Sequence, residues 1–393
     1  MKIITRTILL LSIVSLLTDI SSEMLYPIMP VYLQSLGFSA LLIGILEGIA
    51  EATAGLSKGY FGKLSDSYQR RLPFVQFGYG MSALSKLLLG LFTSIGWVFA
   101  ARTLDRLGKG VRTSSRDALL SSETTPEHKA RVFGFHRSAD TIGAAIGPIV
   151  ALIFLYYYPA HYSALFIIAF IPAVLGVIFT TFIKEKQTIK PPKSHSFTNI
   201  FSFFQYWKIA PKEFRSIVFG LIIFAIINSS DLFILLIIKY RGATDIQVIQ
   251  AYILYNLIFA LSAYPLGIIA DKIGIKRMFT FGIGIFAFVY FAMAITTDYT
   301  LICIILALYG IYAASTEGIS KAWITNVVPK EQAATAIGFT NGFSSLASLV
   351  SGTLAGLLWS IFSPEIPFYV SACGAVVVLL YFLIRFKSIK RIA

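Results

Sequence analysis

The sequence predicts an all-α integral membrane protein with twelve transmembrane helices in two six-helix bundles that are related by an internal repeat. Three observations support this class: the composition, the lengths of the apolar segments, and a motif that occurs twice. Of the 393 residues, 56% are hydrophobic and only 13% are charged, whereas an ordinary soluble protein has about 25% charged residues. The composition therefore excludes an ordinary soluble protein.

Twelve segments approach or exceed the length of about 20 mostly apolar residues that a spanning helix needs. They run near 7–34, 39–61, 73–93, 96–117, 130–157, 162–183, 214–239, 246–269, 278–296, 300–322, 333–361 and 367–386. The first apolar run lacks the small-residue cleavage site of a signal peptide, so we expect it to be a spanning helix. A lysine-rich stretch with the pair Pro191-Pro192 separates the sixth segment from the seventh and is typical of a linker. The predicted bundles are therefore 1–184 and 214–393, joined by a cytoplasmic linker at 185–213.

The net charge is +14, and its distribution along the chain predicts the orientation. Basic residues concentrate in alternate loops, in the linker and at both ends, and the opposite loops carry almost none apart from Lys239 and Arg241. An excess of Lys and Arg marks cytoplasmic loops. We therefore expect a multi-pass protein of a bacterial inner or plasma membrane with both termini in the cytoplasm. The same rule explains the basic charge without a nucleic-acid partner.

The segment from Trp97 to Asp117 has helical periodicity and carries a basic stripe on one side. The stripe consists of Arg102, Arg106, Lys109, Arg112 and Arg116. A charged side chain near the bilayer centre costs about 2.5–3.5 kcal/mol on insertion scales, so these groups must face protein, water or a ligand. We expect Arg112 and Arg116 to snorkel to the inner surface. Arg102 and Arg106 lie deeper, which favours a functional cavity or proton relay over structural ion pairing.

Two pairs of motifs repeat along the chain. GKLSDSYQRR begins at Gly62 and GIIADKIGIKR begins at Gly267, each between the second and third helices of its half. TTPEHKARVFGF at 124–135 is similarly echoed by VVPKEQAATAIGF at 327–339. Two halves repeated in the same orientation are typical of a transporter whose binding site lies between them.

At these motifs the chain resembles the major facilitator superfamily, whose loop between helices 2 and 3 has the pattern G-x-L-a-D-r-x-G-r-k. The first copy matches at Gly62, Leu64, Asp66, Arg70 and Arg71, with Gln69 in place of the second glycine. The second copy matches at Gly267, Asp271, Gly274 and Lys276, with Ile269 in place of leucine. In the family this loop latches the outward-open state. The resemblance implies a cytoplasmic gate formed by Gly62, Asp66, Arg70, Arg71, Asp117, Gly267, Asp271 and Lys276, with Asp117 as a partner for Arg70 or Arg71. The alternative is a solvated turn whose charges only set the topology.

The fourth helix resembles the family motif R-x-x-q-G, which Arg106 and Gly110 match, with Lys109 at the polar position. In the family this arginine helps to transfer protons together with acids on helix 1. The chain offers Asp19 and Glu23 there, one helical turn apart and on one face. Burial raises a carboxyl pKa and a nearby Arg lowers it, which suits a proton-coupled site. We therefore expect Asp19, Glu23 and Arg106 to couple protons, and the alternative is a permanent structural ion pair.

The fifth helix contains GAAIGPIVA, in which Gly143, Gly147 and Pro148 resemble the family motif g-x-x-x-G-P-x-x-G-G. That motif marks antiporters that export drugs and metabolites, although the glycines that end it are absent here. Small residues allow helices to pack closely, and we expect these to lie at the interface between the halves.

By analogy with the family fold, helices 1, 4, 7 and 10 line the substrate cavity. Polar and aromatic residues on these helices and on neighbouring helix 8 give the expected cavity set: Tyr26, Arg102, Lys109, Asn228, Asp231, Tyr255, Glu317 and Lys321. For the aromatic members the alternative is packing against lipid or another helix.

Together these patterns predict a secondary active transporter that moves a small organic solute by alternating access, coupled to protons and directed outward. The basic stripe supports an alternative, a proton- or exchange-driven importer of an organic anion bearing carboxylate or phosphate. No Walker A pattern is present, so ATP drive within the chain is not expected. Four histidines and two cysteines are widely separated, which disfavours a metal site, a cofactor and a membrane-embedded enzyme. The expected partners are the substrate, protons and the bilayer, with the protein as a monomer.

Overall fold

The computed structural model describes residues 3–26, 28–29, 32–33, 36–37, 40–185, 202–229 and 231–385. Within these residues every regular element is a helix. The first half contains α1 Arg6–Leu25, α3 Ala40–Tyr68, α4 Leu72–Leu91, α5 Ile95–Ser122, η1 Pro126–His128, α6 Lys129–Tyr157 and α7 Tyr162–Thr181. Much of the predicted first span beyond residue 26 lies outside the described residues.

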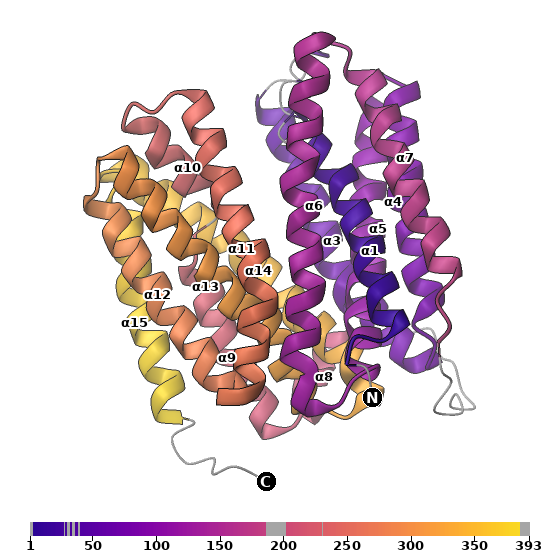
Figure 1. Cartoon of the computed structure of the whole chain (residues 1–393), viewed down its shortest axis with the longest axis vertical. Coiled ribbons are helices and arrows are strands. Elements are labelled where there is room, and N and C mark those ends of the chain that lie inside the picture. Colours follow the sequence, from indigo (N-terminus) through magenta and orange to yellow (C-terminus); the bar gives the residue numbers. More distant parts are fainter. Residues whose placement is uncertain are drawn as a thin grey trace. The chain divides into compact units, whose positions relative to one another are not determined.

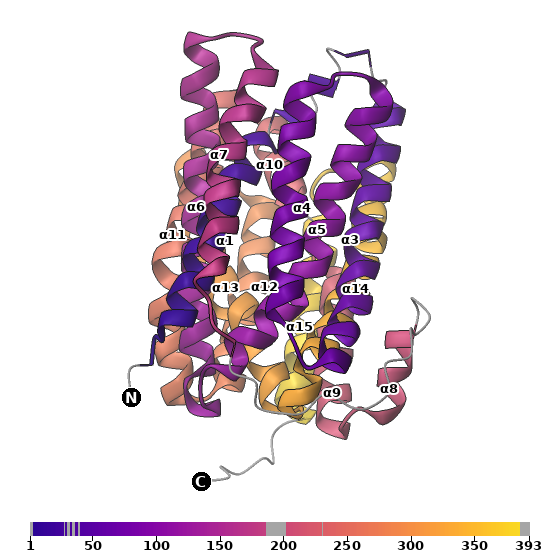
Figure 2. The same cartoon turned by 90° about the vertical axis from the view of Figure 1, so that its right-hand side faces the viewer.

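The helices of the first half pack as long neighbours. The α4 helix packs against α5 and α7, and α1 packs against α7 (Figure 1). A turned view shows α3, α4 and α5 side by side (Figure 2). The α1 helix begins at Thr5, whose hydroxyl accepts a hydrogen bond from the Ile8 amide at 3.3 Å and so caps a free donor of the first turn.

The second half contains α9 Lys212–Ile227, α10 Asp231–Tyr240, α11 Asp245–Ile273, α12 Ile275–Ile295, α13 Tyr299–Asn326, η3 Lys330–Gln332, α14 Ala333–Ile361 and α15 Ile366–Arg385. In this half α13 packs against α11 and α12, and α12 also packs against α15. Two short helices precede it, η2 Ser202–Gln205 and α8 Tyr206–Ile209. They bring Phe203, which is fully buried, against Gly59 of α3, and Trp207 stacks on Phe339 with ring centroids 5.8 Å apart.

The seventh predicted span differs from the prediction. A single helix at 214–239 was expected, but α9 ends at Ile227 and α10 begins at Asp231. Hydroxyl groups from α14 and α15 fill the break. Ser371 donates to the carbonyl of Ile227 at 2.7 Å, and Ser351 donates to that of Asn228 at 2.8 Å. Because these donors replace the lost helical hydrogen bonds, the backbone can be irregular inside an apolar bundle.

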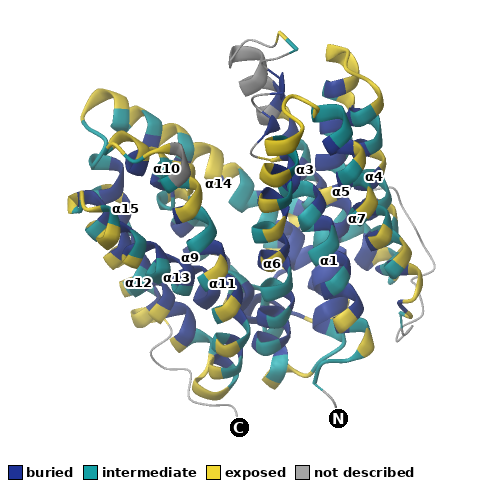
Figure 3. Ribbon diagram, turned by 45° about the horizontal axis from the view of Figure 1, so that its top comes forward, coloured by how far each residue is buried: buried dark blue, intermediate teal, exposed yellow. Residues whose placement is uncertain are grey.

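The side chains that face outward are apolar, as lipid contact requires. In the part of the chain that the structure describes, nine helices are long and apolar enough to cross a membrane. Exposed residues recur along α6 and α12 (Figure 3). On α6 they include Ile142, Ile146, Ile149 and Ile153, which share one helix face. The protein is therefore a multi-pass integral membrane protein.

The described chain divides into two compact units. One comprises Met1–Pro126, Ala139–Ala210 and Val328–Gly342, and the other comprises Glu127–Ser138, Pro211–Val327 and Phe343–Ala393. The division therefore runs through α6 and α14. The first turns of α6 belong to the unit that holds most of the second half of the sequence, and the first turns of α14 belong to the unit that holds most of the first half. The predicted boundary at the linker stays a prediction.

Candidate transport site and gates

An ion pair between a buried arginine and a half-exposed glutamate lies near the middle of α3 and α5. Arg106 Nη1 of α5 lies 3.2 Å from Glu51 Oε1 of α3, and the Glu51 side chain is 48% exposed. One turn along α5, Lys109 is also exposed. It interacts electrostatically with Glu51, Asp19 and Glu23. The sequence resemblance led us to expect the acids of the first helix beside Arg106, and it did not reveal this contact with Glu51.

A second ion pair in this unit is buried. Lys86 Nζ of α4 lies 2.6 Å from Asp105 Oδ1 of α5, and Lys86 is only 1% exposed. The same ammonium group donates to Ser22 Oγ of α1 at 3.2 Å. Lys86 therefore connects three helices. Its sequence neighbourhood, SALSKLLLG, carries no other charge, so no local pattern could have identified Asp105 as its partner.

The expectation that Arg112 and Arg116 snorkel to the surface is wrong. Both side chains are buried, at 5% and 7% exposure. Arg112 donates to Ser82 Oγ at 2.5 Å, and its guanidinium lies 4.5 Å from the Tyr79 ring centroid. Arg116 donates to Ser15 and pairs with Asp117 at 2.9 Å. Internal hydroxyls, a ring face and a carboxylate therefore replace water around the inner part of the stripe.

The first predicted gate motif holds the start of α14. Asp66, near the end of α3, accepts hydrogen bonds from the Thr335 amide at 2.7 Å and from its hydroxyl at 2.8 Å. Arg71 Nη2 pairs with Asp66 at 3.2 Å and also donates to the Lys330 carbonyl. A carboxylate at a helix N-terminus is stabilised by the free amides and by the helix dipole. A Cβ at Gly62 would clash with the Ala334 carbonyl oxygen, so the glycine is needed for this approach.

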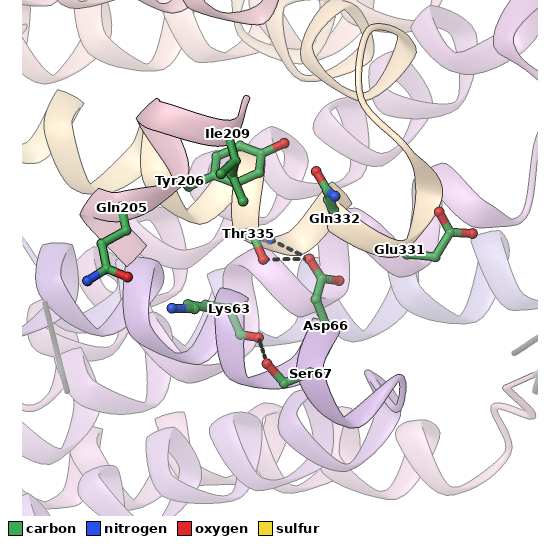
Figure 4. A pocket seen from close by; sticks show the side chains of 9 residues that line it. All are labelled: Lys63, Asp66, Ser67, Gln205, Tyr206, Ile209, Glu331, Gln332 and Thr335. Atoms are coloured by element: carbon green, nitrogen blue, oxygen red, sulfur yellow. Dashed lines mark hydrogen bonds between the residues drawn. The ribbon is translucent and has the colours of Figure 1, made fainter. Parts of the chain in front are cut away.

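Asp66 is almost fully buried, and it lies beyond the predicted span of 39–61. Burial raises its pKa to about 6, although Arg71 and the Thr335 hydrogen bonds oppose that shift. A pocket of about 320 Å³ borders this contact (Figure 4). Its lining consists of Lys63, Asp66, Ser67, Gln205, Tyr206, Ile209, Glu331, Gln332 and Thr335. The gate therefore also borders the short helices of the linker.

The second copy of the motif makes the equivalent contact in the other unit. Asp271, near the end of α11, accepts from the amides of Ala130 and Arg131 at the start of α6, both at 3.1 Å. A Cβ at Gly267 would lie too close to the Ala130 carbonyl oxygen. Lys276 lies in the first turn of α12. The repeat seen in the sequence is therefore also a repeat of contacts.

The two copies of the motif differ at the second glycine of the family pattern, where the first copy has Gln69. Gly274 has φ +101° and Gln69, at the equivalent place in the first copy, has φ +50°. A left-handed conformation costs a non-glycine residue about 1–2 kcal/mol. The Gln69 side chain offsets part of this cost by donating to the Asp66 carbonyl at 2.6 Å and to the Glu331 carbonyl at 3.3 Å. Its second bond crosses to η3, beside the gate contact.

Further contacts at this gate were not foreseen. Arg71 Nη1 reaches the Ala118 carbonyl at 3.5 Å. Glu185 accepts from the amides of Arg71 at 2.8 Å and Leu72 at 3.0 Å, and so caps α4. Nothing in the sequence around Glu185 signals this role. The predicted pairing of Asp117 with Arg70 or Arg71 stays a prediction.

The predicted antiporter motif packs within one unit. A Cβ at Gly143 would lie 2.5 Å from the Leu16 carbonyl oxygen, and a Cβ at Gly147 would lie 2.7 Å from that of Ile20. Both glycines therefore let α6 approach α1, whereas we expected them at the interface between the halves. Pro148 lies inside α6. The Gly143 contact also lies beside Asp19, so the spacing of these helices positions one of the predicted proton-coupling acids.

In the other unit, four of the predicted cavity residues lie near one another. Tyr309 Oη of α13 donates to Asp231 Oδ1 at 2.6 Å, and the ring centroids of Tyr309 and Tyr255 lie 5.1 Å apart. Asn228 donates to Tyr312 Oη at 3.3 Å. Glu317 also interacts electrostatically with Asp231.

Glu317 has a basic partner that the sequence analysis did not identify. Arg137 of α6 pairs with it at 2.5 Å. Lys321 follows Glu317 by one turn on α13 and is partly exposed. In the first unit, Arg102 is buried and Tyr26, at the end of α1, is 55% exposed. Among the residues that the structure describes, no three His, Cys, Asp or Glu side chains gather as metal ligands would.

A family model described as Major Facilitator Superfamily matches residues 11–254 and 217–392. The chain belongs to the major facilitator superfamily. An uncharacterized transporter of this superfamily, MJ1317 of Methanocaldococcus jannaschii, is 34% identical over 95% of this chain and 93% of its own length. A homolog of the multi-drug resistance efflux pump PmrA from Lactococcus lactis is 22% identical over 86% of this chain and 84% of its own length.

Solved structures of superfamily members confirm the fold. The crystal structure of the human organic anion transporter MFSD10 superposes with a TM-score of 0.80 at 14% identity, covering 96% of this chain and 99% of that one. The major facilitator fold that the sequence predicted is therefore confirmed. This protein is a membrane transporter by family.

Proposed function

We propose that this major facilitator protein exports a small organic solute across the plasma membrane in exchange for protons. The observation that carries the proposal is the Arg106–Glu51 pair, which lies near mid-helix yet leaves half of the Glu51 side chain exposed. A purely structural brace would be sealed from solvent. A proton that arrives through water can compete with Arg106 for the carboxylate, and such competition is what coupling requires.

The charges of the stripe favour this proposal over the import of an organic anion. Arg106 is paired with Glu51, Arg116 with Asp117, and Lys86 behind the stripe with Asp105. A substrate carboxylate or phosphate would have to displace these acids. Lys109 is the exposed cation that would suit an anion best, and for that reason anion import remains the second candidate. The PmrA homolog, an efflux pump by name, supports the outward direction.

The two gate contacts support alternating access. Asp66 holds the start of α14 and Asp271 holds the start of α6. We place both contacts on the cytoplasmic side, where they must break before the site opens inward. Proton binding and solute binding then alternate at the residues near the middle of α1, α3 and α5.

Proteoliposomes with an imposed pH gradient test the proposal. With an acidic lumen, exchange of outgoing protons for incoming solute should accumulate a transported compound inside, and dissipating the gradient should release it. A library of amphipathic drugs and metabolites supplies the candidates. A gradient that moves no candidate in either direction counts against proton coupling. Accumulation of organic anions under the opposite gradient, with the acid outside the vesicles, would favour the second candidate.

Asp66→Asn is expected to slow turnover about tenfold. The amide cannot provide the charge that the α14 amides and Arg71 stabilise, and a hydrogen bond to a charged group contributes about 1.5–3 kcal/mol. Initial rates of flux in proteoliposomes measure the effect. Ser67→Ala, at the next and exposed position, is the matched control and should keep the normal rate. Unchanged kinetics in Asp66→Asn would show that the contact is no gate.

A further inference from the structure

We propose that Asp231 binds the positively charged nitrogen of the substrate, so that the solute is an organic cation with an apolar body. The proposal rests on the transport function above and adds the chemical class of the substrate. The residues that support the proposal all belong to one unit. They lie on helices α9 to α15 and on the first turns of α6.

Asp231 is an exposed carboxylate in an apolar span. The segment Lys212–Tyr240 contains an 18-residue window with a mean hydropathy of 2.5, yet Asp231, at the start of α10, is exposed. Among the described residues, no Lys or Arg nitrogen lies within 4.0 Å of its side chain. A charge at this depth costs about 2.5–3.5 kcal/mol. An ion pair within the bundle therefore does not account for it, and a ligand or a proton must.

Tyrosine side chains hold this carboxylate in a fixed place. Tyr309 donates to one of its oxygens at 2.6 Å. The Tyr309 ring lies 5.1 Å from that of Tyr255 and 5.2 Å from that of Tyr312, and all three side chains are buried. Tyr309 occupies one oxygen of Asp231, and the rest of this exposed side chain has a solvent-accessible side. A cation can approach it there without displacing a protein group.

An inorganic cation does not suit this place. Ions such as Na⁺ in transporters are coordinated by the backbone carbonyls of unwound helices. Here the break between α9 and α10 frees the carbonyls of Ile227, Asn228 and Ser229, and each accepts a hydroxyl hydrogen bond. The donors are Ser371 at 2.7 Å, Ser351 at 2.8 Å and Tyr290 at 3.2 Å. Without those oxygens, one carboxylate cannot replace the hydration shell of a small ion.

An anion is disfavoured as well. The guanidinium that acts electrostatically on Asp231 belongs to Arg137, which pairs with Glu317 at 2.5 Å and lies 5.2 Å from the Phe259 ring centroid. Because the Arg137–Glu317 pair is neutral overall, Asp231 gives its surroundings a net negative charge. An organic cation needs a single carboxylate and apolar or aromatic neighbours, because its hydrocarbon part is only weakly hydrated. The surroundings of Asp231 supply both.

Equilibrium binding to the purified, detergent-solubilised protein tests the proposal without any need for transport. The probes are tetraphenylphosphonium, ethidium and benzalkonium, with tetraphenylborate as an anion of nearly the same shape as the first. We expect saturable binding of at least one cation and none of tetraphenylborate. Asp231→Asn should weaken the Kd at least tenfold, whereas Asp231→Glu should keep most of the affinity. Glu213→Gln, which alters an exposed carboxylate at the start of α9, is the control and should bind normally.

Thermal unfolding of each variant shows that the fold is intact, and Asp231→Glu keeps the test valid should the asparagine variant misfold. Absence of saturable binding of all three cations, or an unchanged Kd in Asp231→Asn, overturns the proposal. Its failure is distinct from failure of the transport proposal. Cation binding without flux under a pH gradient would disprove proton coupling and leave the role of Asp231 standing. Flux of neutral or anionic solutes without cation binding would disprove the role of Asp231 and leave proton coupling standing.

Discussion

Arg106→Ala is expected to abolish proton-coupled flux while the protein still reaches the membrane. The alanine leaves the exposed Glu51 carboxylate, 3.2 Å from the guanidinium in the intact protein, without its counter-charge. The carboxylate then holds its proton more tightly, because removal of a nearby cation disfavours the charged form. Solute flux under an imposed pH gradient, normalised to protein incorporated in the vesicles, measures the loss.

Two further variants separate this role from mere packing. Arg106→Lys keeps a charge and should retain part of the flux, whereas Glu51→Gln removes the titrating group and should uncouple flux from the gradient. Lys212→Ala removes an exposed cation at the start of α9 and is the matched control. Normal flux in Arg106→Ala would show that Arg106 is not part of the coupling site.

Lys86→Met is expected to lower the free energy of unfolding by about 3–5 kcal/mol, because it strands a buried charge. Asp105, 2.6 Å from the ammonium group, would keep its carboxylate in the bundle interior without its ion-pair partner, and only the charges of Arg102 and Arg106 would still act on it. The bridge to Ser22 on α1 would also be lost. The midpoint of thermal unfolding in detergent, followed for matched samples, measures this change.

The double variant Lys86→Met/Asp105→Leu is the control for that result. Replacing both members of a buried pair with apolar groups of similar size is often neutral, so the double variant should recover most of the lost stability. Equal unfolding midpoints for Lys86→Met and the unchanged protein would mean that the pair contributes little to the fold.

The contacts of Asp66 and Asp271 show where sequence reasoning succeeds. The repeated motif singled out Asp66 and Asp271, and the structure places each acid on the first amides of a helix. A motif of this kind is local, with glycine, acid and base at fixed spacing. The substitution of Gln69 for glycine gave no sign of its left-handed backbone or of the side-chain bonds that compensate for it.

The partners of the buried charges show where sequence reasoning ends. Helical spacing identifies which residues share a face, but it does not say which neighbouring helix that face meets. Lys86 and Asp105 are 19 residues apart on different helices, and no local pattern signalled that Arg106 pairs with Glu51. The break after Ile227 was equally hidden, because hydropathy measures composition and the hydroxyls that fill the break come from residues 351 and 371.

Water should reach the middle of α5 along the face that carries Lys109, and thiol labelling measures this directly. Cys303 and Cys373 are first replaced by serine, and single cysteines are then introduced as Lys109→Cys and, as a buried control on the same helix, Val111→Cys. A membrane-impermeant methanethiosulfonate reagent is applied to membrane vesicles of both orientations. We predict rapid modification of Lys109→Cys and none of Val111→Cys. Protection of Lys109→Cys from the reagent on both sides of the membrane would contradict a water-accessible coupling site and leave the charges of α3 and α5 as internal braces.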